Sequence, residues 1–388
     1  MFTSQSFARS ALALSAVALI GSTLTGCGSS SGSSSGSGGT DSAQVTAAQK
    51  TVDSFTAAVT SYPAVTPVSG VSALKGKTVW WVPFGTNPVL EGMGAGVQAA
   101  LAKAGITVHT CAGQFTPTSA AACLEQATAQ GASGVVTGYI DYALVKNAYD
   151  ALATKGIPVL LAGVAAPAGF SNKKFAFNHS LAMNSQDQVA MLTEAIADSK
   201  GSANILYLGV NDSPVMAASG KYATSYTAKN CSGCTYHEVD YNTASSAKLS
   251  SQVSSALVSN PDTTYVLCQT AACAAPAIEG IRTASYTNKV KVISSGGAVD
   301  SLQRISAGNS PQIADAGVNQ IYQGWTFADG LLRLMAGEKV PESTAGGIRL
   351  FTKKNISGLK LTSAAALTDE WYGSSSYEDD FLTAWGLK

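Results

Sequence analysis

From Lys77 onward, short apolar runs alternate with amphipathic stretches of helical length, and this alternation constrains the fold more than any other feature. The runs are continuously apolar, which predicts strands whose sheet is covered on both faces. Strands that alternate with helices form right-handed βαβ units and a parallel sheet. The first half of the chain therefore predicts one doubly wound α/β lobe, with strands at 78–84, 106–111, from 134 and at 157–162.

The scheme starts again after Phe175. Further strands are predicted at 205–210, 235–241, 264–268 and 290–294, again with helical spacing between them. Two successive half-chains of one type predict an α/β fold of two doubly wound parallel-sheet lobes joined by a hinge. Because open α/β sheets bind ligands outside the carboxyl ends of their strands, we expect the site in the cleft between the lobes.

The N-terminal segment resembles a bacterial lipoprotein export signal. Arg9 precedes an apolar run, residues 11–20, that is too short to span a bilayer, which takes about 20 residues. The sequence Leu24-Thr25-Gly26-Cys27 resembles a lipobox, in which Cys27 carries the lipid. Residues 28–40 are almost wholly Ser and Gly, a composition typical of a flexible tether. We therefore expect an extracytoplasmic protein anchored to the cell membrane through lipidated Cys27; a plain secretion signal with an incidental cysteine is the alternative.

Residues 43–70 lie before the regular pattern. Their first part has apolar residues at helical spacing, which predicts a helix that packs on the main body, and the rest contains two prolines typical of a linker. The expected organisation is a signal peptide at 1–26, a lipidated Cys and tether at 27–42, a helix and linker at 43–70, lobe 1 at 71–174 plus 319–346, and lobe 2 at 175–318 plus 347–388.

Charge and cysteine content agree with this placement. The 388-residue chain has no net charge and only 12% charged residues, so no basic surface predicts binding to nucleic acid. Apart from Cys27 the chain has six cysteines, an even number that predicts disulfides in an oxidising compartment, although about 15 connectivities are possible. The pair in Cys231-Ser-Gly-Cys234 has a redox or zinc site as its alternative, with His237 the only nearby further ligand. Proximity in sequence favours Cys111 with Cys123, Cys231 with Cys234, and Cys268 with Cys273.

No arrangement of residues predicts catalysis. The only Gly-x-Ser-x-Gly sequences, residues 28–32 and 32–36, lie in the tether, and the three histidines have no metal-ligand spacing. Residues 92–96, Gly-Met-Gly-Ala-Gly, resemble a dinucleotide loop but have the wrong spacing and no acidic ribose partner; close packing of a helix on its sheet is the better interpretation. We expect a protein that is not an enzyme and needs no cofactor or metal.

Two motifs resemble a known family. One is GVVTGYIDYALVKNAYDALATKGIPVL at 134–160, and the other is VKVISSGGAVDSLQRISAG at 290–308, followed by LLRLMAGEKV at 331–340. In order and spacing the run from Gly76 to about Val340 resembles the type I periplasmic solute-binding proteins of the ribose- and galactose-binding branch. No helix-turn-helix precedes it, which argues against a repressor. The resemblance implies a monomer that gives a small-molecule ligand to an ABC permease and its ATPase; the alternative is a lipoprotein of the same fold that signals to a receptor kinase.

The resemblance also implies which residues meet the ligand. Asp141 stands where sugar-binding relatives place an Asp that accepts hydrogen bonds from two sugar hydroxyls, and a helix N-cap is the alternative. Asp212 is a second candidate carboxylate, with capping of the next helix as its alternative. The expected ligand-binding residues are Phe84, Thr86, Asn87, Tyr139, Asp141, Asn178, Asn211, Asp212, Gln269, Thr270, Gly297 and Asn319.

Lobe 2 departs from the family pattern. Relatives carry Asn-Asp where this chain has Gln269-Thr270, and a further Asp is replaced by Gly296 or Gly297. The usual hinge-side Gln falls near Val318, beside Asn319. With two sugar-gripping carboxylates missing, the expected ligand is a small neutral polar molecule, a sugar or a sugar-like compound.

Overall fold

The computed structural model describes residues 42–388, so the predicted signal peptide, Cys27 and the tether lie outside the described residues. The first of its two sheets, which defines lobe 1, is wholly parallel. Its strand order is β2-β1-β3-β4-β5, with β1 at Thr78–Pro83, β2 at Thr107–Thr110, β3 at Gly134–Gly138, β4 at Val159–Ala162 and β5 at Phe175–Asn178.

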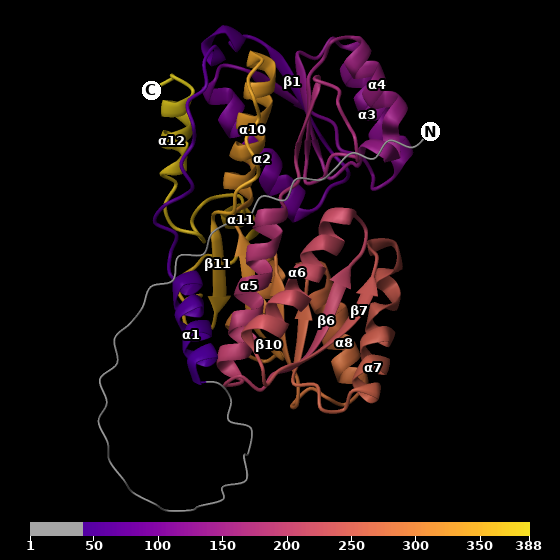
Figure 1. Ribbon diagram of the computed structural model, residues 1–388, viewed down its shortest axis with the longest axis vertical. Helices are drawn as coiled ribbons and strands as arrows, with labels where there is room; N and C mark the ends of the chain where they lie inside the picture. The colour runs from indigo at the N-terminus through magenta and orange to yellow at the C-terminus, as the bar shows by residue number, and fades with distance from the viewer. Residues whose placement is uncertain (1–41) are drawn as a thin grey trace, which may run out of the picture. The chain divides into compact units, whose positions relative to one another are not determined.

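Helices cover both faces of this sheet (Figure 1). Hydrophobic clusters place α2 and α10 on one face and α3 and α4 on the other. The helices are α2 at Pro88–Lys103, α3 at Pro117–Ala129, α4 at Lys146–Thr154 and α10 at Gln320–Ala336, with short 3-10 turns at Val71–Leu74 and Tyr142–Val145.

The glycine run at 92–96 brings α2 and α10 close together. A Cβ on Gly96 would lie 2.2 Å from the carbonyl oxygen of Ile321, and one on Gly324 would lie 2.3 Å from the carbonyl oxygen of Met93. Neither position has room for a side chain, so these two glycines allow helix α2 to pack on helix α10. The expected close packing of α2 on its sheet is seen at Gly94, where a Cβ would lie 2.6 Å from the indole nitrogen of Trp81 in β1.

The second sheet defines lobe 2 and contains one antiparallel edge strand, β11 at Ile348–Thr352. Its order is β11-β10-β9-β8-β6-β7, with β6 at Asn204–Val210, β7 at Thr235–Tyr241, β8 at Tyr265–Cys268, β9 at Lys291–Ser295 and β10 at Gln312–Val318. The helices are α5 at Leu181–Asp198, α6 at Pro214–Asn230, α7 at Leu249–Ser259, α8 at Ala274–Thr283 and α9 at Val299–Ala307, with 3-10 turns at Thr243–Lys248 and Ala271–Cys273. The predicted fold of two parallel-sheet lobes is confirmed.

Two short crossovers orient the lobes. The first is residues 179–180, between β5 and α5, and the second is Asn319, between β10 and α10. Only His179 and Ser180 separate β5 of lobe 1 from α5, which packs on the lobe 2 sheet. Because α5 leads directly into β6 and runs back along it, the first turn of α5 lies at the carboxyl end of the lobe 2 strands. The carboxyl ends of the two sheets therefore face each other across the crossovers.

The crossovers are also bonded to one another. Gln323 Nε2 of α10 donates to the Ser180 hydroxyl at 3.0 Å, and the amide of Asn319 donates to the carbonyl of Gly347 at 2.8 Å. His179 Nε2 lies 3.5 Å from a carboxylate oxygen of Glu342, on the third crossing segment. These contacts join three of the segments that pass between the lobes.

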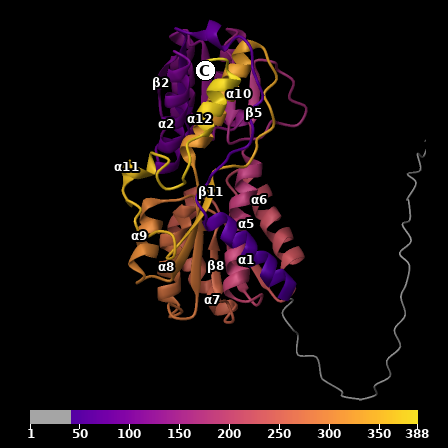
Figure 2. The same cartoon turned by 90° about the vertical axis from the view of Figure 1, so that its left-hand side faces the viewer.

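The ends of the described chain pack on opposite lobes (Figure 2). Helix α1, Ser42–Thr56, lies beside α5 and β11 of lobe 2, whereas α12, Tyr377–Ala384, lies on α10 of lobe 1. Trp385 stacks on Trp325 of α10 with ring centroids 5.6 Å apart, and its indole nitrogen donates to Asp329. Between these elements, the short α11 at Ser363–Ala366 belongs to a cluster under α9 and β11.

The expected domain boundaries differ from this arrangement in two places. Residues 175–178 pair with β4, so they belong to the lobe 1 sheet and not to the start of lobe 2. The last residues, with α12, pack on lobe 1 and not on lobe 2. Both differences arise where the chain crosses between lobes, because sequence periodicity identifies an element but not the sheet that it joins.

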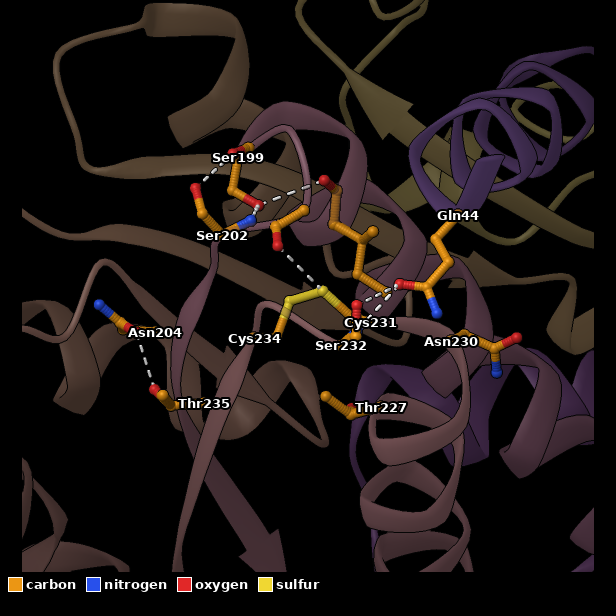
Figure 3. The surroundings of a disulfide bond; sticks show 12 residues. Gln44, Ser199, Ser202, Asn204, Thr227, Asn230, Cys231, Ser232, Cys234 and Thr235 are labelled. Atoms are coloured by element: carbon orange, nitrogen blue, oxygen red, sulfur yellow. Dashed lines mark hydrogen bonds between the residues drawn. A yellow bond between two sulfur atoms is a disulfide. The ribbon is translucent and has the colours of Figure 1, made fainter. Parts of the chain in front are cut away.

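The six cysteines described lie in three close pairs. Cys111 is joined to Cys123, Cys231 to Cys234, and Cys268 to Cys273. The turn closed by Cys231 and Cys234 also holds α1 against lobe 2, since Gln44 of α1 accepts hydrogen bonds from the amide and hydroxyl of Ser232 (Figure 3).

Candidate ligand-binding site

The expected ligand-binding residues all lie at the facing ends of the two sheets, as the last residue of a strand or shortly after it. Lobe 1 supplies Phe84, Thr86 and Asn87 after β1, Tyr139 and Asp141 after β3, and Asn178 at the end of β5. Lobe 2 supplies Asn211 and Asp212 after β6, Gln269 and Thr270 after β8, Gly297 after β9, and Asn319 after β10.

Asp141 is half-buried and its carboxylate has no partner in the described part of the chain. It occupies the N-cap position of the turn at Tyr142–Val145, but its side chain makes no capping hydrogen bond. Only its main-chain oxygen is used, accepting from the amide of Leu144 at 3.1 Å. Burial raises the pKa of the Asp141 carboxyl above its usual value, because nothing nearby compensates the charge. The carboxylate is therefore available to accept hydrogen bonds from a ligand.

Tyr139 is held at the junction of the lobes. Its backbone has a φ of 59°, in the left-handed region that non-glycine residues rarely adopt. The ring lies against Gly163, where a Cβ would approach it to 2.7 Å. Burial raises the pKa of the Tyr139 phenol to about 12, partly offset by hydrogen bonding to Gln323 and Ser180. Tyr139 therefore carries a neutral hydroxyl, placed where both crossovers meet.

Two amide side chains predicted to meet the ligand are instead bonded to the protein itself. Gln269 accepts from the amide of Val210 at 2.6 Å and donates to the carbonyl of Met216 at 2.9 Å. Asn319 is fully buried. Its oxygen accepts from the Tyr322 amide, and its nitrogen donates to Asp369 at 2.6 Å and to the Tyr62 hydroxyl at 3.1 Å.

These contacts give both residues a structural role, and contact of either with a ligand stays a prediction. Gln269 ties the carboxyl ends of two strands together, and Asn319 caps α10 and fixes the second crossover. The sequence places each residue at a strand end, but it does not show that nearby main-chain groups need the same amide.

Three other residues have partly structural roles. The Asn87 oxygen accepts from the Leu90 amide at 2.9 Å and so caps α2. The Asn178 oxygen accepts from the amide of Ser180 at 3.3 Å. The Gly297 amide donates to buried Asp315 at 2.7 Å. Each residue keeps part of its hydrogen-bonding capacity, so each stays a predicted ligand contact.

The remaining expected residues present accessible or half-buried side chains. Thr86, Asn211 and Asp212 are exposed. Ser213, and not Asp212, caps α6, since its hydroxyl accepts from the Met216 amide. Of the two others, Phe84 packs edge-to-face on the exposed ring of Phe115, and the Thr270 hydroxyl lies 3.2 Å from that of Tyr241.

Sequence reasoning gave no role to two buried polar groups near these ends. The side-chain oxygen of Gln320, the first residue of α10, is buried without a hydrogen-bond partner among the described residues, and the Cβ of the same side chain packs against Gly92. Asp187, buried in α5, has its pKa raised by burial and lies close enough to Tyr139 to raise that pKa as well. In the sequence, only its place at the start of a helix could have drawn attention to Gln320, and nothing could have drawn attention to Asp187.

A hollow of about 240 Å³ opens beside Thr86, between α2 and the β1–β2 edge of lobe 1. Trp81 forms its inner wall, and Gly94 leaves space above the indole because a Cβ there would lie 2.6 Å from the indole nitrogen. Trp80 is also buried but lies beside His109. Of the two tryptophans, Trp81 alone borders this space.

Residues 42–388 contain no group of three His, Cys, Asp or Glu side chains that could hold a metal ion. Within the same part of the chain, no helix is both long and apolar enough to cross a membrane.

Comparison with known proteins places this geometry in context. A family model described as a periplasmic binding protein domain matches residues 78–339, which confirms the resemblance that the sequence motifs predicted. No curated protein matches the sequence.

Several solved structures share the fold at low identity. A 5-methylthioribose transporter solute binding protein from Thermotoga lettingae is 18% identical, with a TM-score of 0.60, over 73% of this chain and 88% of its own. A glucose-galactose binding protein from Geobacillus stearothermophilus is 15% identical, with a TM-score of 0.62, over 73% and 99%. A sugar ABC transporter structure from Yersinia enterocolitica is 18% identical, with a TM-score of 0.62, over 83% and 98%.

Proposed function

This chain belongs to the periplasmic binding protein family, and we propose that it is an extracytoplasmic lipoprotein that captures a sugar or sugar-like molecule between its two lobes. It delivers that ligand to the permease and ATPase of an ABC importer and catalyses no reaction itself. The similar structures from Thermotoga lettingae and Geobacillus stearothermophilus carry the names of a methylthioribose and a glucose-galactose binding protein.

The free carboxylate of Asp141 is the observation that carries the proposal. A half-buried carboxylate without a protein partner suits a polyhydroxylated ligand, because hydrogen bonds to an ionised acceptor are about twice as strong as neutral ones. The neutral Tyr139 hydroxyl and the exposed side chains of Asn211 and Asp212 offer further polar contacts. A ligand that contacts both lobes favours the closed arrangement to the extent that it binds that arrangement more tightly.

Export and anchoring rest on Cys27 and on the paired cysteines. Disulfides persist in oxidising compartments, and six cysteines lie in three close pairs. Peptide mapping of the unreduced protein should find each pair linked, and mass analysis of membrane-bound protein should find a lipid on Cys27. Free thiols in the exported protein, or an unmodified N-terminal peptide, would contradict this part of the proposal.

A thermal-shift screen tests ligand capture. The protein without its signal and tether is unfolded, refolded to remove carried ligand, and mixed with sugars, polyols, nucleosides, amino acids and small aromatic compounds. A ligand at about 100 times its Kd should stabilise the fold by about 2.7 kcal/mol, which is a clear shift in Tm. A shift with a sugar or polyol supports the proposal, whereas a shift only with aromatic compounds or nucleosides, or none at all, contradicts it.

A further inference from the structure

We propose that the ligand carries a positive charge, as an amino sugar or an amino polyol does. This inference rests on the proposed function and replaces the neutral ligand expected from the sequence with a cationic one. Its basis is the distribution of charge over the facing strand ends together with the absence of a protein partner for Asp141.

The strand-end segments contain two acids and no fixed positive charge. Asp141 and Asp212 are the acids, and His179 is the only other titratable side chain besides Tyr139. No lysine or arginine occurs in these segments, which are residues 84–87, 111–116, 139–141, 163–168, 179–180, 211–213, 242, 269–270, 296–298 and 319.

Three basic side chains in or near these segments have partners other than Asp141. Lys146, five residues beyond Asp141, forms an ion pair with Asp150 on its own helix. Arg349, near the start of β11, donates to the carbonyl of Trp371 at 2.6 Å. His179 accepts from the Leu181 amide and faces Glu342. None of these three side chains pairs with Asp141 in the described structure.

A cationic ligand corrects this imbalance better than a neutral one. Closing the lobes on a ligand removes more water from Asp141, and an uncompensated carboxylate is costly to bury. A neutral hydroxyl supplies a hydrogen bond but leaves the charge in place. An ammonium group supplies the hydrogen bond and the opposite charge together, while a carboxylate or phosphate on the ligand would meet a like charge. The site should therefore rank amine above neutral compound, and neutral compound above acid.

Matched triads of ligands test this order. One triad is D-glucosamine, D-glucose and D-glucuronate; a second is D-galactosamine, D-galactose and D-galacturonate; a third is the open-chain set of glucamine, sorbitol and gluconate. We measure Kd by calorimetry at neutral pH and low salt for the refolded protein. In at least one triad the amine should bind about tenfold or more tightly than the neutral member, because the ammonium adds an opposite charge to a hydrogen bond that both can make, and the acid should not bind.

The Asp141→Asn variant identifies the group responsible. Asparagine keeps the shape and an acceptor but removes the charge, so the preference for the amine over the neutral compound should disappear. The Asp150→Asn variant is the matched control, since Asp150 is an acid of the same lobe paired with Lys146 and outside the strand ends. It should keep the preference unchanged. The Tm of each variant without ligand shows whether it folds.

The outcomes separate the inference from the proposed function. Binding of neutral members with no preference for amines overturns the charge inference and leaves sugar capture standing. A preference for amines that persists in Asp141→Asn also overturns it, because Asp141 would not be its source. No binding by any member of the three triads contradicts sugar capture itself, and the inference then fails with it.

Discussion

Polar side chains at the strand ends of the two lobes are used in two different ways. In lobe 1, Asp141 occupies a helix-capping position and makes no cap, so its carboxylate has no partner within the described chain. In lobe 2 and at the second crossover, Gln269 and Asn319 use their amides on the protein itself. Both sets of residues follow strands in the same way, and only their hydrogen-bond partners distinguish them.

We propose that the Asp141 carboxylate contacts the ligand, whereas the bonded amides of Gln269 and Asn319 hold the strand ends and the second crossover in place. Buried main-chain groups need hydrogen-bond partners, and an amide that donates and accepts can satisfy two of them at once. A carboxylate only accepts, so it is poorly suited to join an amide to a carbonyl. The bonding roles of Gln269 and Asn319, and the unbonded carboxylate of Asp141, follow from this chemistry.

Replacement of Asn319 should have the largest effect and should act on stability. Asn319→Ala removes the α10 cap and leaves Asp369 without its amide donor, so we expect a loss of about 3 to 4 kcal/mol in the free energy of unfolding. Urea denaturation measures it. Asn211→Ala, which removes an exposed strand-end amide, is the control and should change stability by less than about 0.5 kcal/mol. Equal losses of stability in the two variants would show that the hydrogen bonds of Asn319 stabilise the fold no more than an exposed amide does.

Asp315, in β10, gives a pH-dependent test of lobe 2, where buried polar groups bond to the protein itself. The carboxylate accepts from the Ser294 hydroxyl and the Gly297 amide, yet burial raises its pKa to about 6. In the unfolded chain the group ionises near pH 3.8. Between these values the native state holds a proton that the unfolded state has lost, so stability falls as the pH rises.

Asp315→Asn cannot ionise and should lack this dependence. Between about pH 4 and pH 6 the wild type should lose about 3 kcal/mol relative to the variant, the equivalent of two pKa units. Urea denaturation of both proteins across this range measures the difference in their free energies of unfolding. The contributions of the other carboxylates are the same in both proteins and cancel in this difference. A difference that does not vary with pH would show that Asp315 titrates as an ordinary exposed carboxylate.

Replacement of Asp141 should affect ligand affinity and leave stability unchanged. Asp141→Ala removes a charged acceptor from the ligand, at a cost of about 2 kcal/mol in binding free energy. Its Tm without ligand should equal or exceed that of the wild type, because the charge it removes is uncompensated. Calorimetry and thermal unfolding of one sample give both values. Reduced stability with unchanged affinity would assign Asp141 to the structure and not to the ligand.

Much of the fold could be predicted from sequence because buried parallel strands are continuously apolar. The runs at 78–84 and 205–210 correspond to β1 and β6 within a residue or so. Strand β5 lacks that signal. Its Phe-Ala-Phe-Asn sequence is too short and mixed to predict a strand, and its sheet is set by pairing with β4, which local sequence does not encode.

The candidate site was predictable in position but not in the use of each side chain. The family resemblance named both Asp141 and Asn319, and a polar residue that follows a parallel strand lies at the same edge of the sheet whatever its use. Whether a side chain stays free depends on main-chain groups far away in the sequence, such as the Val210 amide that bonds Gln269. That information exists only in three dimensions.

The smallest expected effect concerns the contact between α1 and lobe 2, which is remote from the strand ends. Gln44→Ala removes the acceptor of the Ser232 amide and hydroxyl beside the Cys231–Cys234 pair (Figure 3), at a cost of about 1 kcal/mol. The loss should appear as faster hydrogen exchange of amides in α1, since helix ends open locally. Gln49→Ala is the matched control, because Gln49 bonds only to Asp53 within the same helix.

Faster exchange in Gln44→Ala with unchanged ligand affinity would show that the contact between α1 and lobe 2 is energetically separate from the ligand site. A change in affinity would show instead that α1 influences the lobes through β11, and the division between gripping and supporting regions would then have to include the N-terminal helix.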